Sequence, residues 1–321
     1  MKLLIIGTGV IGSTYGWQLS KAGYNVTLLV KKEVEDLYKN QGITIEFVDK
    51  RQKKRIEGKE VLHLNVDSLE GIDDDYDFVF VPVQRQHIIE TLKEISGKLQ
   101  KSTIVIFQNN WKCSEEFEEI LQKEQYIYAF PHMVGGTREN RMIKTIIFGD
   151  GNTRIGAVDN SNSDKVNSLY EILKEAGMRP KITENIEHWI ISHYIQQSSG
   201  IGVFLKYGSP TSVVRSYRRI SELIDVAREG LKVCEKRGIN ARKISPINFL
   251  YYPKLLTVPM FKRMFSDDDE LFMIEGHMKN GLKEMVTGYE EVLQEGKELG
   301  LKMNKWESYS SYVSNAKKAN L

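Results

Sequence analysis

Met-Lys-Leu-Leu-Ile-Ile-Gly-Thr-Gly-Val-Ile-Gly, residues 1–12, combines an apolar run with three closely spaced glycines. The run from Leu3 to Ile6 predicts a strand that is buried on both faces. The glycines that follow have the spacing of the GxGxxG dinucleotide-binding fingerprint. In that fingerprint Gly7 permits a tight turn, Gly9 lets the backbone approach a pyrophosphate, and Gly12 lets the next helix pack closely on the strand.

The residues after the glycines support this interpretation. An amphipathic helix is expected from Val10 to Ala22, and a second strand from Asn25 to Val30. The free N–H groups and the positive dipole end of such a helix would face the phosphates of a dinucleotide. We therefore predict a Rossmann-type domain whose coenzyme-binding loop consists of Gly7, Thr8, Gly9, Val10, Ile11 and Gly12.

Two lysines at the end of the second predicted strand indicate which coenzyme the loop binds. Sites that prefer NAD usually carry an Asp or Glu there, which accepts hydrogen bonds from the ribose 2′-OH. This chain carries Lys31 and Lys32 instead, and ammonium groups attract a 2′-phosphate. The pattern favours NADP(H) over NAD(H). The alternative is that both lysines simply begin a solvent-exposed helix.

Length and composition describe an ordinary globular protein with room for two domains. The 321 residues include 41% hydrophobic and 27% charged side chains, and the formal net charge is +2. This balance argues against nucleic acid as a partner. The one dense basic run, 50–55, lies between two alternating segments and contains no aromatic residue, so we interpret it as a solvated turn between strands.

The cysteines, the histidines and the apolar segments argue against a metal-binding, secreted or membrane-spanning protein. Cys113 and Cys234 lie far apart and outside any metal-binding spacing, which favours reduced thiols and a cytoplasmic protein. The six histidines form no metal-binding motif, so no metal is expected. The first apolar run is too short for a secretory leader, and no segment has the length of a membrane span.

Strand-like and helix-like segments alternate through the first half of the chain, which predicts an α/β domain with a doubly wound parallel sheet. Further strands are expected at 77–83, 102–107, 126–129, 145–148 and 153–157, and helices at 32–41, 86–99, 115–122 and 164–176. After Ile182 the pattern becomes helical, with helices expected at 220–237, 275–299 and 306–317. We therefore predict an NADP-binding domain at 1–182 and an all-helical substrate and dimerisation domain at 183–321.

Four motifs accompany this two-part pattern. They are the glycine loop with a basic residue after the second strand, the strand-end sequence 107–110 (Phe-Gln-Asn-Asn), the sequence 186–189 (Ile-Glu-His-Trp), and Lys283-Glu284 ahead of 296–300 (Gly-Lys-Glu-Leu-Gly). Together they resemble the ketopantoate reductase (2-dehydropantoate 2-reductase) family over most of the chain. The resemblance implies that NADPH reduces a 2-keto acid, with the substrate bound between a Rossmann half and a helical half.

The resemblance also implies roles for two residues. Asn109 matches the family's Asn in a Gln-Asn-Gly turn, which lies beside the nicotinamide ribose and the substrate. The family's Gly is Asn110 here, and asparagine tolerates positive φ better than other non-glycine residues. Glu284 matches a family Glu that hydrogen-bonds the hydroxyl end of the substrate. Without the family, Asn109 would be part of a plain strand-end turn and Glu284 a solvated carboxylate.

Two lysines of the family pattern are missing. The family's proton-donating lysine falls at Ile191, two residues after the tryptophan that matches Trp189. Hydride addition to a ketone leaves an alkoxide that must be stabilised or protonated, so a reductase needs another donor. We expect His193 to take this role because it lies one helical turn after Trp189 and histidines titrate near neutral pH, with Tyr194 as second choice. The alternative is a core histidine bound to a backbone carbonyl.

The second lysine of the family pattern belongs at the end of the strand near Val83. It is absent here, and this chain has Gln84-Arg85-Gln86 instead. Arg85 is suited to hold a substrate carboxylate in a bidentate pair. An exposed arginine on the first turn of a helix is the commoner situation, and this alternative stays open.

Three functions are compatible with these residues. The first is an NADP-dependent reductase of ketopantoate or, because the donor site is altered, of a related 2-keto acid. The second is an opine-forming or 3-hydroxyacid dehydrogenase with the same two-domain plan. The third is a sensor that binds NADP without turnover. Apolar helix faces near the C-terminus would also allow a homodimer (Val286, Tyr289, Leu293).

Overall fold

The protein is described here by a computed structural model of residues 1–149, 153–159 and 162–320. The chain divides into two compact units. The first comprises Met1–Gln108 and Lys112–Glu187, and the second comprises Asn109–Trp111 together with the chain from His188 onward. A short piece of chain after a strand of the first unit therefore packs with the second.

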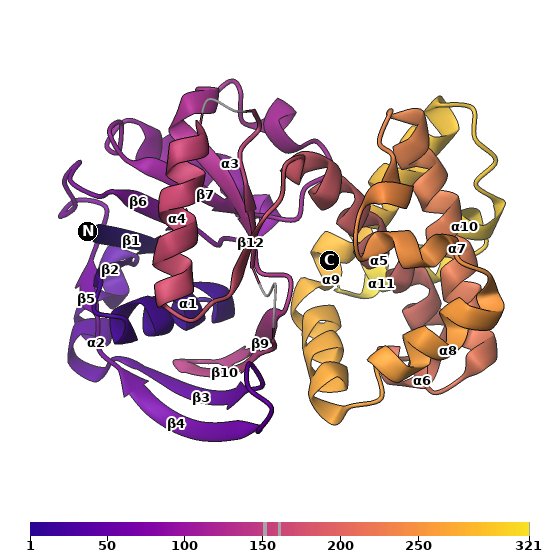
Figure 1. Ribbon diagram of the computed structural model, residues 1–321, viewed down its shortest axis with the longest axis horizontal. Coiled ribbons are helices and arrows are strands. Elements are labelled where there is room, and N and C mark those ends of the chain that lie inside the picture. The colour runs from indigo at the N-terminus through magenta and orange to yellow at the C-terminus, as the bar shows by residue number, and fades with distance from the viewer. Residues whose placement is uncertain (150–152, 160–161, 321) are drawn as a thin grey trace. The chain divides into compact units, whose positions relative to one another are not determined.

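An eight-stranded sheet forms the centre of the first unit (Figure 1). In spatial order its strands are β12 (Pro180–Ile182), β11 (Thr153–Gly156), β8 (Tyr126–Phe130), β7 (Thr103–Phe107), β6 (Phe78–Val81), β1 (Lys2–Ile6), β2 (Asn25–Leu29) and β5 (Asn65–Asp67). Neighbours from β5 to β8 pair in parallel, whereas β11 runs antiparallel to β8. The order around β1 is that of a doubly wound dinucleotide-binding sheet, in which ligands bind where the order reverses, here outside β1 and β6. The predicted α/β fold class is confirmed.

A second sheet belongs to the same unit. It contains, in order, β4 (Ile56–Leu62), β3 (Ile43–Asp49), β10 (Met142–Ile147) and β9 (Val134–Glu139). Helix α1 (Val10–Lys21) contacts strands of both sheets, and Figure 1 shows it between them. The other helices of this unit include α2 (Glu35–Gln41), α3 (Arg85–Ser96) and α4 (Ser163–Glu175).

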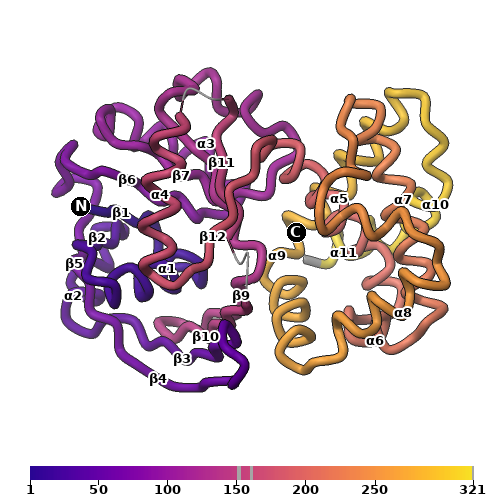
Figure 2. Tube along the Cα trace, in the orientation of Figure 1, coloured from indigo at the N-terminus to yellow at the C-terminus, as the bar shows by residue number. Residues whose placement is uncertain are grey.

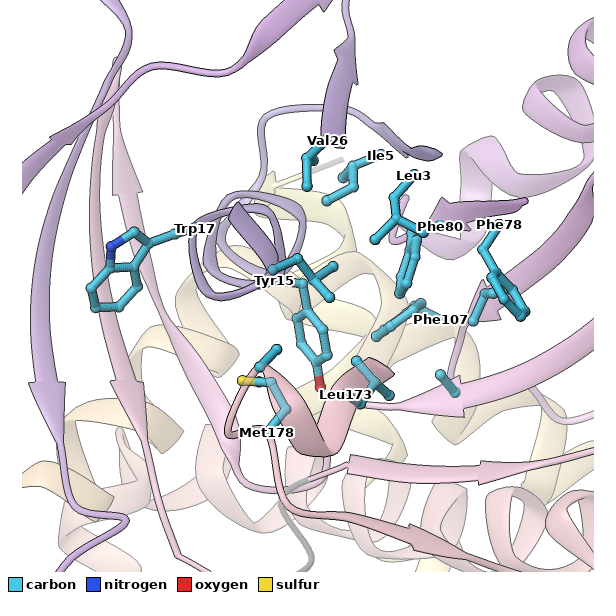
Figure 3. Packing of buried hydrophobic residues seen from close by; sticks show 14 of the residues in the cluster. Leu3, Ile5, Tyr15, Trp17, Val26, Phe78, Phe80, Phe107, Leu173 and Met178 are labelled. Carbon is cyan, nitrogen blue, oxygen red and sulfur yellow. The ribbon is translucent and has the colours of Figure 1, made fainter. Parts of the chain in front are cut away.

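Helix α1 is anchored by aromatic side chains on two of its sides. Tyr15 packs edge-on against Phe107 with ring centroids 4.9 Å apart, and its hydroxyl shares a 2.6 Å hydrogen bond with Thr153. Trp17 leaves the helix in another direction (Figure 3). Its ring centroid lies 4.7 Å from that of Phe47 in the second sheet. Aromatic pairs of this kind add to the burial energy. The amino end of α1, which carries the glycine loop, is thereby held between two sheets.

One expectation for the first unit is wrong, and one of its strands was not expected. No α-helix forms at 115–122; within this described stretch the chain makes a 3-10 turn, η2 (Cys113–Glu116). Cys113 has a positive φ of 52°, and the Ser114 N–H is bound 2.8 Å from a Glu187 carboxylate, so the chain bends and buries Phe117 without helical continuation. Strand β9 was not expected because its two glycines weaken the strand pattern, and it is stabilised by pairing with β10.

The second unit is helical, as predicted (Figure 2). Its α-helices include α5 (Ile186–Tyr207, entering from the first unit), α6 (Pro210–Val214), α7 (Tyr217–Lys236), α8 (Lys254–Met264), α9 (Asp268–Glu298), α10 (Asn304–Glu307) and α11 (Ser310–Asn320). The prediction of one continuous helix at 306–317 is wrong. The Trp306 carbonyl accepts a hydrogen bond from the Tyr289 hydroxyl, and the chain turns there. In the described part of the chain, no helix has the length and apolar character that crossing a membrane requires.

Candidate coenzyme and active site

The glycine loop has the geometry that a bound pyrophosphate requires. Gly7 has a positive φ of 90°, and its N–H donates to the Leu29 carbonyl at 3.0 Å, which turns the chain sharply out of β1. A Cβ on Gly12 would lie 2.7 Å from the Gly7 carbonyl oxygen, so only glycine allows this close packing. A Cβ on Gly9 would meet no described atom within 4 Å, which leaves open space over the backbone.

Gly9 is the N-cap of α1, and no side chain caps the helix there. The first N–H groups of a helix lack intrahelical partners and attract anions. The open space over Gly9 and these uncapped groups therefore fit a dinucleotide phosphate. The six predicted loop residues lie together at this point, as their sequence spacing requires.

The two predicted lysines differ in their surroundings. Lys31 is exposed at the start of the 3-10 turn η1 (Lys32–Val34) and makes no ion pair with a described residue. Lys32 is paired with Glu35 at 2.9 Å, and Lys39 binds the same carboxylate at 2.5 Å. These hydrogen bonds from Lys39 and Lys32 lower the pKa of Glu35 to about 2. The Glu35 carboxylate is therefore ionised, its charge is balanced by two ammonium groups, and the residue is only 6% exposed, so it is poorly placed to accept a ribose hydroxyl.

Arg85 begins α3, directly after the strand β6 that neighbours β1. Its guanidinium donates to Glu116 at 3.1 Å, and only 11% of its side chain is exposed. The alternative of an exposed arginine is therefore wrong. The position after β6 is compatible with the predicted carboxylate-binding role, which stays a prediction.

Asn109 follows β7 and packs in the second unit, where its amide nitrogen donates to the Gln197 side-chain oxygen of α5. The pair joins residues 88 positions apart. The sequence alone did not identify Gln197 as a partner of Asn109. Its spacing of four residues from His193, one helical turn, was the available signal.

Two polar atoms of this amide pair have no hydrogen-bond partner among the described residues. They are the buried Asn109 Oδ1, an acceptor, and Gln197 Nε2, a donor. The hydroxyl of Ser198, the next residue on α5, is in the same condition. A buried polar atom without a partner costs about 1–3 kcal/mol. A ligand that offers one donor and one acceptor would remove this cost, which suits a carboxamide or a hydroxy acid.

The surroundings of the two candidate proton donors, His193 and Tyr194, differ. His193 is partly buried on α5, and its ring packs edge-on against Trp189 with centroids 5.0 Å apart. The Tyr194 hydroxyl already donates to Glu291 at 2.6 Å, and the residue is 1% exposed. Ile191 is buried and carries no titratable group. His193 therefore remains the better candidate of the two.

Glu284 lies on α9, three residues after the non-helical Gly281, and is partly buried. One turn later on the same face, a Cβ at Gly288 would meet Ser198 Oγ at 2.4 Å. Glu291, a further turn along, binds Tyr194. These contacts make α5 and α9 antiparallel, with Ser198 and Tyr194 of α5 facing Gly288 and Glu291 of α9. Glu284 stands one helical turn before Gly288, at which α9 meets Ser198 of α5.

Among the described residues, no group of three or more His, Cys, Asp and Glu side chains is placed to hold a metal ion. Both cysteines are buried and reduced. Burial raises the pKa of the Cys234 thiol to about 12, so it is not a reactive thiolate.

A Rossmann unit with this glycine loop, followed by an all-helical unit, is typical of two-domain dinucleotide-dependent oxidoreductases. Residues 3–160 match the family model described as ketopantoate reductase PanE/ApbA. The resemblance of this chain to the ketopantoate reductase family, seen in its motifs, is thereby confirmed.

Individual relatives agree with this result. A 2-dehydropantoate 2-reductase from Pyrococcus horikoshii is 25% identical over 275 residues, covering 83% of this chain and 84% of the relative. The solved structure of D-mandelate dehydrogenase with NADH and anilino(oxo)acetate has a TM-score of 0.75 at 15% identity and covers 99% of both chains. A 2-dehydropantoate 2-reductase from Geobacter metallireducens has a TM-score of 0.74 at 14% identity, covering 98% of this chain and all of the other. At these identities the two structures show the fold alone.

Proposed function

We propose that this chain is an NADPH-dependent reductase that converts a 2-keto acid to the corresponding 2-hydroxy acid. The observation that carries the proposal is the glycine cradle at the amino end of α1, with open space over Gly9 and the exposed ammonium group of Lys31 after the neighbouring strand. The family match to ketopantoate reductases supports the reaction type.

The bound coenzyme supplies a hydride to the keto carbon, and the residues of this chain do the remainder. His193 donates the proton that the keto oxygen requires. The unpartnered atoms of Asn109 and Gln197 orient the reacting groups, and Glu284 accepts a hydrogen bond from the hydroxyl end of the substrate. Arg85 holds the substrate carboxylate. The division of tasks between 1–182 for coenzyme and 183–321 for substrate and dimerisation is part of the same proposal.

Coenzyme preference gives the first test. We expect NADPH to bind tighter than NADH, because Lys32 and Lys39 balance the charge of the buried Glu35 carboxylate and Lys31 is available to a 2′-phosphate. Lys31→Ala should weaken NADPH binding by roughly fivefold, as expected for a partly screened charge, and leave NADH within a factor of about two. The dissociation constants are measured by tryptophan fluorescence. The D-mandelate dehydrogenase neighbour was solved with NADH, so tighter NADH binding is the outcome that would refute this part.

Turnover gives the second test. Purified protein is mixed with NADPH and a panel of 2-keto acids that includes ketopantoate and aryl 2-keto acids, since the D-mandelate dehydrogenase neighbour holds anilino(oxo)acetate. We expect His193→Gln to lower kcat on the best substrate by about 100-fold, the usual contribution of a general acid. Glu284→Ala should mainly raise KM. His188→Gln, an exposed histidine on the same helix, is the matched control. Unchanged kcat and KM in both His193→Gln and Glu284→Ala would contradict the assigned roles of these two residues.

A specific observation favours a second candidate, the NADP-binding sensor. The family lysine that donates the proton is replaced by the buried Ile191. If NADPH binds and no keto acid is reduced, the sensor is the better description of the protein.

A further inference from the structure

An arginine from the second sheet is connected to the glycine loop through the hydroxyl of Tyr38. Arg138 of β9 donates from Nη2 to the Tyr38 hydroxyl of α2 at 3.0 Å. The same hydroxyl lies 3.1 Å from the Thr8 hydroxyl, and Thr8 stands between Gly7 and Gly9. Three elements far apart in the chain therefore meet at the loop that begins the coenzyme site.

The position of this arginine is well determined by its neighbours. Tyr38 is 5% exposed and belongs to the core of the unit. Arg138 pairs with Ile143 in the β9–β10 ladder, and its Nε donates to the Asn140 carbonyl at 2.8 Å. Strand β9 also packs against α1. The guanidinium is thus fixed in place although the residue is exposed to solvent.

The charge of this guanidinium is not compensated. Arg138 makes no ion pair with a carboxylate in the described ranges, and its two hydrogen bonds are to neutral oxygens of Tyr38 and Asn140. An arginine has five N–H donors. Two are used, so three remain for an anion. A fixed guanidinium with free donors matches the geometry of a phosphate.

The neighbours of Arg138 indicate which phosphate it meets. The pyrophosphate lies against the second glycine and the helix that follows it. The ribose that distinguishes NADP from NAD lies at the end of the second strand, which here leads through Lys31 and η1 into α2. Tyr38 is on α2, so the contact from Arg138 to the loop is on the ribose side.

We propose that Arg138 binds the 2′-phosphate of NADP(H) and so helps to select this coenzyme, an inference that rests on the proposed function. Tyr38 is a positioning residue that holds the guanidinium next to Thr8. The coenzyme selector of this chain then combines Lys31 after β2 with an arginine from a strand outside the Rossmann topology.

The test measures dissociation constants for NADPH and NADH, without substrate, by fluorescence titration at fixed ionic strength. We expect Arg138→Ala to weaken NADPH by about tenfold or more and NADH by less than about twofold, because only NADPH carries the third phosphate. Arg138→Lys should fall between, since a lysine keeps the charge but loses the planar fork. Adenosine 2′,5′-bisphosphate, but not ADP, should lose its stabilising thermal shift in the alanine variant.

Lys144→Ala is the matched control, because it removes an exposed positive charge from the paired strand β10. It should leave both dissociation constants unchanged. An equal loss for both coenzymes in Arg138→Ala would place the arginine at the pyrophosphate and overturn the proposal, and so would no loss at all. If the wild type binds neither coenzyme or prefers NADH, both the proposed function and this inference fail. If the wild type prefers NADPH and Arg138→Ala keeps that preference, only this inference fails.

Discussion

Replacing Gly9 with alanine is expected to weaken coenzyme binding on the order of 100-fold while leaving the protein folded. The backbone of Gly9 has φ −68° and ψ 174°, which alanine adopts without strain, and the added Cβ meets no described atom within 4 Å. The cost to folding is confined to the poorer N-cap, about 1 kcal/mol or less. The methyl group instead occupies the space that a pyrophosphate needs. Fluorescence titration with NADPH and thermal unfolding measure the two effects.

Gly12→Ala should show the opposite pattern. Alanine favours a helix over glycine by about 1 kcal/mol, but here its Cβ would lie 2.7 Å from the Gly7 carbonyl, a backbone atom that cannot move aside. Overpacking of this kind costs about 1–3 kcal/mol, so a net loss of stability is expected. Gly97→Ala, at an unobstructed helix end with ordinary φ, is the control and should change neither property. A Gly9→Ala protein that binds NADPH normally would contradict the assignment of this loop.

Asn109→Ala is expected to lower kcat/KM by about 100-fold on whichever keto acid is reduced, because misplacement of a positioning group by about 1 Å has effects of that size. The side chain donates to Gln197 and leaves its own oxygen for a ligand. Gln197→Ala should therefore lose nearly as much activity. The double variant should lose little more than either single variant, with a coupling energy of about 1–3 kcal/mol. The measurement is a double-mutant cycle on kcat/KM.

Gln196→Ala is the control for this cycle, since it removes the neighbouring, half-buried amide from the same helix. Its activity should stay within about twofold of the wild type, in line with a substitution away from the reacting groups. Strictly additive losses in Asn109→Ala and Gln197→Ala would show that the two amides act separately. Thermal unfolding of each variant distinguishes a lost function from a lost fold.

The Rossmann core could be predicted because its signals are local. The apolar run of β1, the glycine spacing and the helix that follows occupy residues that are neighbours in the chain, and each has a physical requirement that few residue types meet. The same holds for the change to a helical pattern after Ile182. The helix expected at 115–122 does not form because the conformation there depends on a hydrogen bond that the Ser114 N–H donates to the distant Glu187 carboxylate. The break between α10 and α11 likewise depends on Tyr289, outside both helices.

Only part of the candidate site could be predicted from the sequence, for the same reason. Gly7, Gly9 and Gly12 are visible as a motif, whereas Asn109 and Glu284 were identified through a family resemblance. Gln197 carried only its spacing of one helical turn from His193, and Arg138 carried no sequence signal that tied it to the site. Their partners lie 88 and 100 positions away, at Asn109 and Tyr38.

Local sequence alone established a glycine-rich turn after the first strand, two lysines after the second strand and a helical second half. Tertiary structure alone decided that a second sheet packs against α1, that Arg138 of its strand β9 binds Tyr38 of α2, and that Asn109 pairs with Gln197 of α5. The physical reason is that backbone turns and amphipathic periods depend on residues that are close together in the chain. Hydrogen bonds between elements depend on how separate strands and helices pack, and no period in the chain records that.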